Sequence, residues 1–521
     1  CKTACPAHVA VQGYLKLAAQ GRYDEALALI KRENPLPAIC GRVCNRRCED
    51  ACTRDRVDAA VAIDEVKKFI AQRDLDAATR YVPPVVTPTR AGGFDQKIAI
   101  IGAGPAGLSC AFYLAEKGYK PVVFEKNERP GGMLTYGIPS FKLQKDVIEA
   151  EVEVIRLMGA EFRYGVEVGR DVTLDELRAQ GFKAFYVAIG CQGGRLAGIP
   201  GEGAEDVTVA VDFLREVNSG KINALPGRTI VVGGGNVAID VARNACRLGS
   251  EHVEMFCLES EAQMPASEEE RREAVEDGAH ISCGWGPKEI HLDEAGRVCG
   301  ITFKRCTRVF DDEGRFAPEY DESDLRRVDA DRVVMSIGQS IVWGDLLAGS
   351  KVELGRGQGA LADPQTYQTA EPDIFVGGDV YTGPSFAIDA IAAGHEAAVS
   401  IHRFVQPGST LTIGRNQRRY TALDRDDVVL ESYDSASREV AHVDREREKA
   451  APFSEYVETF TEEQVRAETA RCLGCGASIV DPNKCIGCGL CTTKCAFDAI
   501  HLDRDRPECS TMVKYEQKLP S

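Results

Sequence analysis

Two glycine-rich loops and two groups of cysteines are the residues of this chain whose types and spacing could do chemistry. The loops are Gly102-Ala103-Gly104-Pro105-Ala106-Gly107 and Gly233-Gly234-Gly235-Asn236-Val237-Ala238. Such loops let the backbone approach a dinucleotide pyrophosphate at a helix N-terminus. Clustered cysteines in a reducing compartment are typical of iron–sulfur ligation. Because a flavin converts hydride into the single electrons that clusters carry, the combination predicts a redox relay.

The cysteines are concentrated at the two ends of the chain. Of 20 cysteines, six lie between residues 1 and 52 and seven between residues 472 and 509. The scattered remainder are expected to be small buried hydrophobes. The four from Cys40 to Cys52 recur every four residues, so one continuous helix would align their thiols on one face. The ligands predicted in the first group are Cys1, Cys5, Cys40, Cys44, Cys48 and Cys52.

The second group contains the spacing of bacterial ferredoxins. Cys485, Cys488, Cys491 and Cys495 follow the C-x2-C-x2-C-x3-C pattern and predict a [4Fe–4S] cluster. With Cys472, Cys475 and Cys509 the group has seven thiols, whereas two cubane clusters need eight. The Cys472-x2-Cys475 pair is therefore predicted to serve a second cluster, with a structural or zinc-like site as the alternative. Two to four clusters are expected in the whole chain.

The sequence around the first glycine loop is that of a complete dinucleotide-binding unit. A buried-strand pattern over residues 97–101 leads into the loop, and a helical pattern over 108–117 follows. A second apolar run ends in Glu125, 23 residues after Gly102, and Lys126 comes next. An acidic residue at this distance binds a ribose hydroxyl. We expect the dinucleotide on Gly102, Gly104, Pro105, Ala106, Gly107, Glu125 and Lys126.

The second glycine loop repeats this logic and predicts a nicotinamide dinucleotide on Gly233, Gly235, Asn236 and Val237. Its second strand, over residues 253–258, ends in Glu259. A carboxylate there favours a free ribose hydroxyl and repels a 2′-phosphate, which favours NAD(H) over NADP(H). In the alternative, Glu259 is merely solvated and Arg271 or Arg272 holds the phosphate.

A third strand-and-turn pattern runs from Glu371 to Asp379 and precedes a helical pattern over residues 387–401. Gly378-Asp379 is compatible with an ordinary turn. After two dinucleotide-binding units, however, a strand that ends in aspartate is expected to close a flavin site.

Composition and charge restrict the class of protein. The chain is 44% hydrophobic with a formal net charge of -17, so nucleic acid and anionic membranes are not expected partners. It has neither an apolar run of about 18 residues nor a signal-peptide pattern, and a cytoplasmic location is expected. Because the sequence starts at Cys1 rather than methionine, cluster ligands upstream are an open alternative.

The predicted fold class is α/β. Two dinucleotide-binding domains are preceded by a helical iron–sulfur domain and followed by a ferredoxin-like tail. The helical patterns over residues 9–33 and 57–73 support the first of these. Residues 406–470 are rich in charge, and we expect a solvated linker or, alternatively, a segment that wraps an interface. The expected units are 1–90 (helical), 91–215 with 330–405 (FAD), 216–329 (NAD(P)), 406–470 (connector) and 471–521 (ferredoxin-like).

Several motifs together resemble the glutamate synthase small-subunit family. They are residues 40–44, 129–139, 233–240, 264–265 and 377–380. That family includes the electron-input half of dihydropyrimidine dehydrogenase and the large subunit of NADH-dependent ferredoxin:NADP oxidoreductase. The resemblance covers roughly residues 1–405, and the tail is similar to a ferredoxin appendage of some members.

The resemblance implies specific roles for residues. It places FAD on Gly102, Gly104, Gly107, Glu125, Gly132, Leu134, Gly378 and Asp379. It implies a cluster on Cys5, Cys44, Cys48 and Cys52, with Cys1 serving a second one. Members that use NADP typically carry two arginines where this chain has Leu258 and Glu259, and this departure supports NAD.

The chain is therefore expected to be an enzyme subunit that oxidises or reduces NAD(H) through FAD. Because hydride passes directly between nicotinamide and flavin, no acid–base side chain is required and none is predicted. Electrons are expected to reach ferredoxin or other redox subunits of a complex, and electron bifurcation is left open. The alternatives are a glutamate synthase small subunit and a wiring module whose nicotinamide site is idle.

Overall fold

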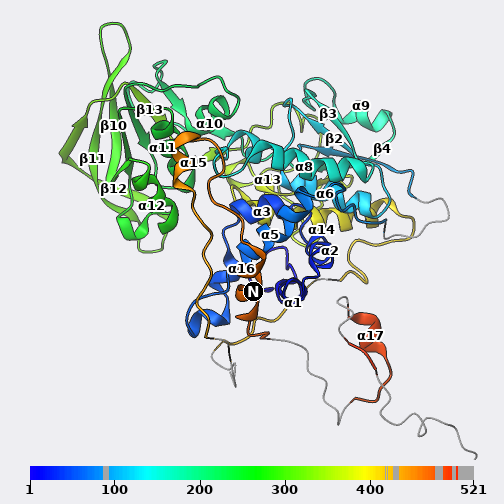
Figure 1. Cartoon of the computed structure of the whole chain (residues 1–521). Helices are drawn as coiled ribbons and strands as arrows, with labels where there is room; N and C mark the ends of the chain where they lie inside the picture. Colours follow the sequence, from blue (N-terminus) through cyan, green and yellow to red (C-terminus); the bar gives the residue numbers. More distant parts are fainter. Residues whose placement is uncertain are drawn as a thin grey trace, which may run out of the picture.

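The computed structural model describes residues 1–85, 93–416, 418, 420–425, 433, 435–475, 485–495 and 500–502. Cys509 lies outside these residues. Figure 1 shows a helical N-terminal unit below two α/β units that lie side by side. In the described part of the chain, no helix is both long enough and apolar enough to cross a membrane.

The first α/β unit is built on a five-stranded parallel sheet in the order β15-β4-β1-β2-β3. Its central strands are continuous apolar runs because helices cover both faces of the sheet. Helix α14 packs on α6, and both belong to one core with α8. The elements are β1 Lys97–Ile101, β2 Val122–Glu125, β3 Glu161–Tyr164, β4 Phe182–Val187, β15 Ile374–Val376, α6 Pro105–Glu116, α8 Lys145–Leu157, α9 Leu174–Ala179 and α14 Ala387–Val405.

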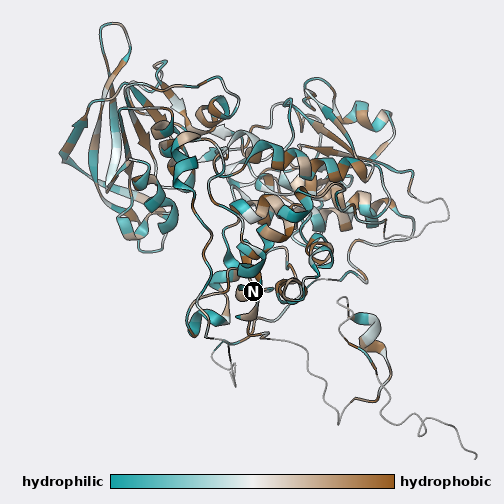
Figure 2. Ribbon diagram, viewed as in Figure 1, coloured by the Kyte–Doolittle hydropathy of each residue, from teal (hydrophilic) through white to brown (hydrophobic). Residues whose placement is uncertain are grey.

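The second α/β unit has a parallel sheet in the order β6-β13-β7-β8-β9 and an antiparallel sheet β10-β11-β12. Figure 2 shows hydrophilic residues on the outer helix α12 of this unit. The elements are β6 Val207–Val209, β7 Arg228–Val232, β8 His252–Cys257, β9 His280–Cys283, β10 Trp285–Leu292, β11 Val298–Phe310, β12 Phe316–Val328, β13 Arg332–Met335, α10 Ala210–Asn218, α11 Asn236–Arg247 and α12 Glu268–Glu276.

The boundaries between the two units along the sequence differ from those expected. Strand β13 pairs in parallel with both β6 and β7, in the sheet of the second unit. Residues 207–209 and 332–335 had been expected in the FAD domain. The second unit therefore begins before residue 216 and ends after residue 329. Sequence periodicity could not show this, because strand pairing joins segments more than 100 residues apart.

Short elements connect the two units. Strands β5 and β14 form a two-stranded antiparallel pair between segments that link them. The short helices α7 and α13 start just after the turns of Gly132 and Gly378, respectively. These elements are β5 Gly193–Gly194, β14 Gln339–Ser340, α7 Met133–Tyr136, α13 Asp379–Thr382, η2 Glu261–Gln263 and η3 Arg356–Gln358.

The N-terminal unit is helical, as predicted, but its cysteine segment is not one helix. Helix α3 ends at Val43, Cys44 has extended backbone dihedral angles, and Arg46 adopts a left-handed conformation before α4. The four cysteines therefore do not form a stripe along a single helix. The elements are α1 Val11–Ala19, α2 Tyr23–Lys31, α3 Pro37–Val43, α4 Arg47–Asp50, η1 Thr53–Arg56 and α5 Ile63–Leu75.

Residues 406–470 are not simply a solvated linker, so the wrapping interpretation describes them better. Figure 1 shows the described residues 435–470 running from the N-terminal unit to residues 445–450 beside the second unit and back to the N-terminal unit. Tyr456, Phe460 and Val465 are buried. Helix α15 (Arg445–Ala450), by contrast, is polar and has no buried residue. A capping box formed by Thr461 and Gln464 starts α16 (Glu462–Ala470), which contacts α1.

A buried polar network fixes the end of α16 against the N-terminal unit. The Arg471 side chain is fully buried and donates hydrogen bonds to Asp58 Oδ1 at 2.9 Å and to Glu468 Oε1 at 2.6 Å. Glu468 Oε1 also accepts the Ala62 N–H at 2.7 Å, and Arg54 donates to the Arg471 carbonyl at 3.1 Å. Removing one partner from a buried ion pair typically costs ~3–5 kcal/mol. The residues next to Arg471 are therefore held in place.

Candidate functional site

The first glycine loop is packed so tightly that side chains would not fit at two of its glycines. Gly102, at the end of β1, has a φ of +105°, and a Cβ there would lie 2.5 Å from the Ala188 carbonyl oxygen. A Cβ on Gly107 would lie 1.9 Å from the Gly102 carbonyl oxygen. These two glycines let helix α6 start directly against the end of β1, so its N-terminal N–H groups point out of the loop.

Other positions around the loop are open and face a cavity. A Cβ on Gly104 would meet nothing within 4 Å, and Pro105 is the first residue of α6. A Cβ on Gly132, whose φ is +55°, would approach the Cα of Gly104 at 3.1 Å. Together with Ala106 and Leu134, these residues line one cavity. The loop is thus tightly packed on the side of the sheet and open on the side of the cavity, which is the arrangement that a dinucleotide pyrophosphate needs.

Glu125 lies where a ribose acceptor is required. It ends β2 and is buried, and its Oε2 accepts the Ala103 N–H at 2.8 Å while Oε1 accepts the Asn127 N–H at 2.9 Å. These bonds hold the carboxylate beside the loop, at the edge of the same cavity. Lys126 is exposed and lines a smaller neighbouring pocket together with Gly102 and Glu125.

Gly378 and Asp379 line the same cavity beside the first loop. The φ of Gly378 is +68°, and a Cβ there would lie 3.0 Å from that of Ala106. Asp379 Oδ1 accepts the Ser385 N–H at 3.2 Å. Burial, with a smaller contribution from the nearby charge of Asp389, raises the pKa of Asp379 to about 6. The carboxyl is thus poised to accept a hydrogen bond from a bound hydroxyl when ionised.

We expect flavin binding to depend on the ionisation of Asp379. Because its pKa in the flavin-free fold is about 6, protonation stabilises that fold at low pH and the effect is lost as pH rises through 6. Affinity for FAD should therefore weaken about tenfold from pH 7.5 to pH 5 in a fluorescence titration of flavin-free protein. Asp379→Asn should abolish this pH dependence, and Asp345→Asn, at an exposed carboxylate, should retain it. An unchanged pH profile in Asp379→Asn would refute this role.

The second glycine loop has the same division between packed and open positions. Gly233 has a φ of +143°, and a Cβ there would lie 2.2 Å from the Ser336 carbonyl oxygen. A Cβ on Gly235 would meet nothing within 4 Å. Asn236, the first residue of α11, accepts the Ser267 N–H at 3.1 Å through Oδ1. The residues of this loop fit a second dinucleotide on the same physical grounds.

The carboxylate of Glu259 lies against the second glycine loop. Its Oε2 would be 2.9 Å from a Cβ built on Gly234. Arg271 donates to the Glu261 carbonyl oxygen at 2.7 Å, and Arg272 pairs with Glu276. The charge nearest the loop is therefore the negative charge of Glu259. Arg271 and Arg272, the alternative ligands for a 2′-phosphate, interact with Glu261 and Glu276 instead.

The first glycine loop and Val237 of the second loop line one cavity, which is the central feature of the site. It is lined from the first unit by Gly104, Gly132 and Asp379 and from the second by Val237 and Asp240. A cofactor on the first loop and one on the second would meet there. Direct hydride transfer requires such a meeting and no acid–base side chain.

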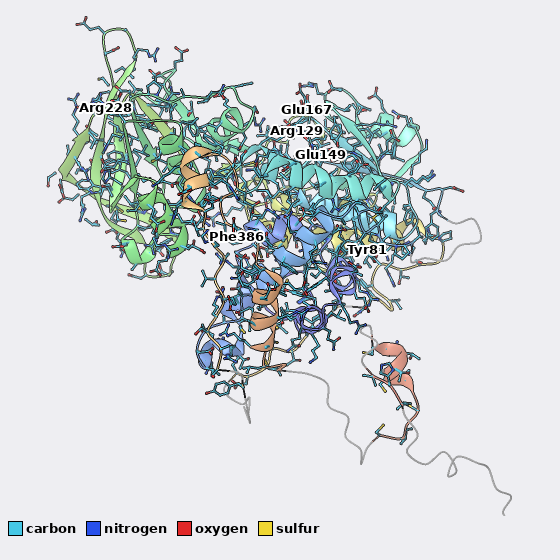
Figure 3. The ribbon with its side chains drawn as sticks, viewed as in Figure 1. Tyr81, Arg129, Glu149, Glu167, Arg228 and Phe386 are labelled. Atoms are coloured by element: carbon cyan, nitrogen blue, oxygen red, sulfur yellow. The ribbon has the colours of Figure 1, made fainter. Side chains whose placement is uncertain are left out.

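The sequence did not single out several residues that line this cavity. Gly190 follows β4, and Phe386 precedes α14. Figure 3 labels Phe386 between the N-terminal unit and the α/β units. The Arg47 guanidinium lies 5.4 Å from its ring centroid, and Arg47 also bonds Asp389 at 3.0 Å. The only sequence signal for Gly190 was its position just after an apolar strand. The carboxyl ends of parallel strands lie at the same edge of a sheet, so Gly190 comes close to the glycine loop that follows β1.

Four cysteines gather inside the N-terminal unit. The thiol of Cys44 interacts electrostatically with those of Cys5, Cys40 and Cys48. Burial raises the pKa of these last two well above the usual value, so they favour the neutral form until iron binds. Buried Lys67 lies near the same thiols and pairs with Asp64. A cation there suits the negative charge of a thiolate-bound cluster.

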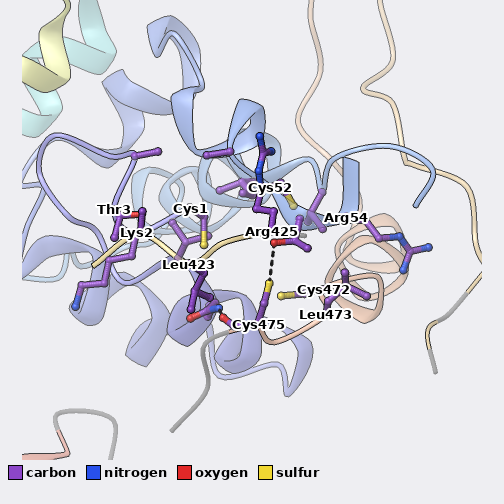
Figure 4. A pocket seen from close by; sticks show the side chains of 18 of the residues that line it. Cys1, Lys2, Thr3, Cys52, Arg54, Leu423, Arg425, Cys472, Leu473 and Cys475 are labelled. Atoms are coloured by element: carbon purple, nitrogen blue, oxygen red, sulfur yellow. Dashed lines mark hydrogen bonds between the residues drawn. The ribbon is translucent and has the colours of Figure 1, made fainter. Parts of the chain in front are cut away.

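Cys52 and Cys1 lie in a different place, beside Cys472 and Cys475 at one pocket. Figure 4 shows these four side chains around that pocket. The remaining tail cysteines are on or near the short helix α17 (Leu490–Lys494), where Cys485 and Cys488 are exposed and Cys491 and Cys495 are half-buried. Across the described residues, no group of His, Cys, Asp or Glu side chains is arranged to hold a single metal ion.

Family models match three segments of the chain. Residues 96–394 match the pyridine nucleotide-disulphide oxidoreductase model, 1–79 match "dihydropyrimidine dehydrogenase domain II, 4Fe-4S cluster", and 478–501 match a 4Fe-4S binding domain. The first match covers more than half of the chain. The chain belongs to the pyridine nucleotide-disulphide oxidoreductase family. The predicted fold class is thereby confirmed, and the 35% identity to the glutamate synthase small chain of Escherichia coli confirms the predicted resemblance.

Curated relatives of this family member are themselves oxidoreductase subunits. It is 35% identical to the NADP(+)-dependent formate dehydrogenase subunit beta of Moorella thermoacetica, over 91% of this chain and 70% of that protein. It is 35% identical to the small chain of NADPH glutamate synthase from Escherichia coli, over 78% of this chain and 88% of that protein. It is 31% identical to the NADPH-Fe(3+) oxidoreductase subunit beta of Geobacter sulfurreducens, over 91% and 75%.

The likeness to solved structures concerns the fold. FprA from Mycobacterium tuberculosis superposes with a TM-score of 0.51 at 19% identity, over 60% of this chain and 84% of that one. From the family matches and relatives together, the chain is an electron-transfer subunit of a flavin- and NAD(P)-dependent iron–sulfur oxidoreductase.

Proposed function

We propose that this subunit oxidises or reduces NAD(H) through FAD and exchanges single electrons, through its [4Fe–4S] clusters, with ferredoxin or a partner redox subunit. The single observation that carries the proposal is the cavity that the first glycine loop lines together with Val237, which follows the glycines of the second loop. Bound FAD would take hydride from the nicotinamide and pass electrons on one at a time. The Arg47 contacts to Phe386 and Asp389 place the N-terminal unit directly against this cavity.

The roles of the residues follow from their positions. Gly102, Gly104, Pro105, Ala106 and Gly107 would hold the FAD pyrophosphate, with Gly132 and Leu134 lining the cavity beside them. Glu125 would bind the adenosine ribose, and Gly378 with Asp379 the hydroxyls near the flavin. Gly233, Gly235, Asn236 and Val237 would hold the nicotinamide dinucleotide, and Glu259 its ribose.

NADH is proposed as the physiological nucleotide. The carboxylate of Glu259 at the second glycine loop supports this choice. The relatives named above as NADP- or NADPH-dependent point the other way. A 2′-phosphate placed beside the carboxylate of Glu259 would be repelled, so the charge at the ribose position favours NADH.

An anaerobic titration with NADH tests the proposal. NADH should bleach the flavin absorbance of the purified protein, and reduced clusters should then appear by EPR. No bleaching with either NADH or NADPH would exclude the oxidoreductase and leave a wiring module whose nicotinamide site is idle.

The tail cluster should be separable from the flavin. Cys488→Ala should remove one cluster signal from the EPR spectrum of reduced protein, while FAD content and flavin bleaching by NADH stay unchanged. The reason is that α17 is separate from the cavity that the first glycine loop lines. Iron analysis of the intact protein should give about eight to sixteen irons per chain, for two to four clusters. Loss of FAD together with the tail signal would contradict the separation.

A glutamate synthase small subunit is the second candidate function. It is favoured by the 35% identity to the Escherichia coli small chain, of which this chain covers 88%. Reconstitution with a glutamine-dependent large subunit separates the two functions. We expect no turnover of glutamine plus 2-oxoglutarate, and native purification should bring down other redox subunits. Turnover with such a large subunit would establish the second candidate.

A further inference from the structure

The pocket in Figure 4 brings together cysteines from the two ends of the chain. We propose that Cys1, Cys52, Cys472 and Cys475 ligate one [4Fe–4S] cluster. The Cys472-x2-Cys475 pair then completes a cluster of the N-terminal unit and does not belong to the ferredoxin-like tail. This inference rests on the proposed function only in taking the clusters to be its electron carriers.

The pocket has the size and lining that a cluster needs. Its volume is about 480 Å³. Apolar side chains form much of its wall, contributed by Val11, Leu15, Val61 and Ile63 of the N-terminal unit and by Leu423 and Leu473 of the later chain. Lys2 and Arg54 also line it. Apolar walls limit access of water to a cluster, and nearby cations offset the charge of its thiolates.

The thiols from the two ends are close to one another. Cys472 interacts electrostatically with Cys475 and also with Cys52. The Cys475 thiol lies 3.5 Å from the Thr53 hydroxyl, the residue next to Cys52. The Gln12 side-chain amide, from α1, donates a hydrogen bond to the Cys475 carbonyl oxygen. The C-terminal pair therefore contacts the N-terminal unit on both sides of the pocket.

The placement of the C-terminal pair is imposed by the fold. Cys472 directly follows Arg471, whose side chain is fully buried and bonded to Asp58 and Glu468. Glu468 is also fully buried and accepts the Ala62 N–H, ten residues after Cys52. Polar groups this deeply buried are kept only where all partners are in place. The network presents Cys472 to the pocket independently of any metal.

The recognised cluster segments do not account for Cys472 and Cys475. The matched iron–sulfur segments end at residue 79 and begin at residue 478, so Cys472 and Cys475 lie in neither.

The assignment also separates the cysteines into consistent sets. Cys52 moves from the set implied by the family resemblance to this pocket, and Cys5, Cys40, Cys44 and Cys48 remain together around Lys67. The tail run from Cys485 to Cys495 keeps its own ferredoxin spacing. Ligation at the shared pocket forms four iron–sulfur bonds, and each thiol passes its proton to water, so no oxidant or reductant is consumed.

Paired variants test whether the two ends hold the same cluster. Cys1→Ala/Cys52→Ala and Cys472→Ala/Cys475→Ala should each lose about four irons per chain and the same EPR signal of the dithionite-reduced protein. Combining all four changes should still lose only about four irons. The control pair Cys488→Ala/Cys491→Ala should lose a different signal. A loss of about eight irons in the combined variant would overturn the proposal, since each end would then hold its own cluster.

A measurement on unmodified holoprotein covers the case in which a variant fails to fold. Anaerobic alkylation during slow removal of iron by a chelator, followed by peptide mass spectrometry, should label Cys1, Cys52, Cys472 and Cys475 with one common rate. Labelling of Cys472 and Cys475 at the rate of Cys485 and Cys488 instead would refute the shared site. Neither experiment uses NADH, so a failure of the proposed nucleotide chemistry would be recognised separately by unbleached flavin.

Discussion

Gly107→Ala should yield protein that lacks its flavin. A Cβ at this position would lie 1.9 Å from the Gly102 carbonyl oxygen, so α6 must move away from β1 by more than an ångström. The N–H groups at the start of α6 then no longer meet the pyrophosphate. We expect less than about a tenth of the normal FAD content by absorbance, and a loss of NADH-dependent dye reduction of about 100-fold or more.

Gly203→Ala is the matched control for this prediction. Gly203 is exposed, its φ is not in the left-handed region, and a Cβ there meets nothing within 4 Å. This variant should keep full flavin content and activity. Cluster signals should persist in Gly107→Ala, because their ligands lie in other parts of the chain. A fully flavinylated Gly107→Ala protein would show that α6 does not seat the pyrophosphate.

NADH should be preferred over NADPH by at least about tenfold in kcat/KM, equivalent to about 1.4 kcal/mol. The 2′-phosphate would face the carboxylate of Glu259 at the glycine loop. Glu259→Gln should raise kcat/KM for NADPH about tenfold and lower that for NADH, because the repulsion and the hydrogen bond to ribose are both weakened. Steady-state dye reduction with each nucleotide measures both effects.

Glu251→Gln provides the control, since Glu251 is exposed and lies just before β8, at the opposite end of that strand from Glu259. It should leave the preference unchanged. Faster turnover with NADPH than with NADH in the unmodified protein would refute the assignment of Glu259 and align this chain with the relatives whose names specify NADP or NADPH.

The sequence by itself determined the two dinucleotide-binding units and their glycine loops. These signals are local, because a buried strand, a glycine turn and a helix follow one another within about 30 residues. The acidic residues at the strand ends, Glu125 and Glu259, were predicted as ribose-binding groups for the same reason. The ferredoxin spacing of the tail was likewise contained in a single short segment.

The tertiary structure decided which distant segments meet. Strand β13 joins the sheet of the second unit although more than 70 residues separate it from β8. Phe386 lines the cavity beside the first glycine loop, although its segment contains no motif. The sequence showed Cys52 and Cys472 as members of two separate groups, whereas the fold sets them beside one pocket. Spacing along the chain could not indicate this, because the meeting depends on burial of Arg471 and Glu468 against residues more than 400 positions away.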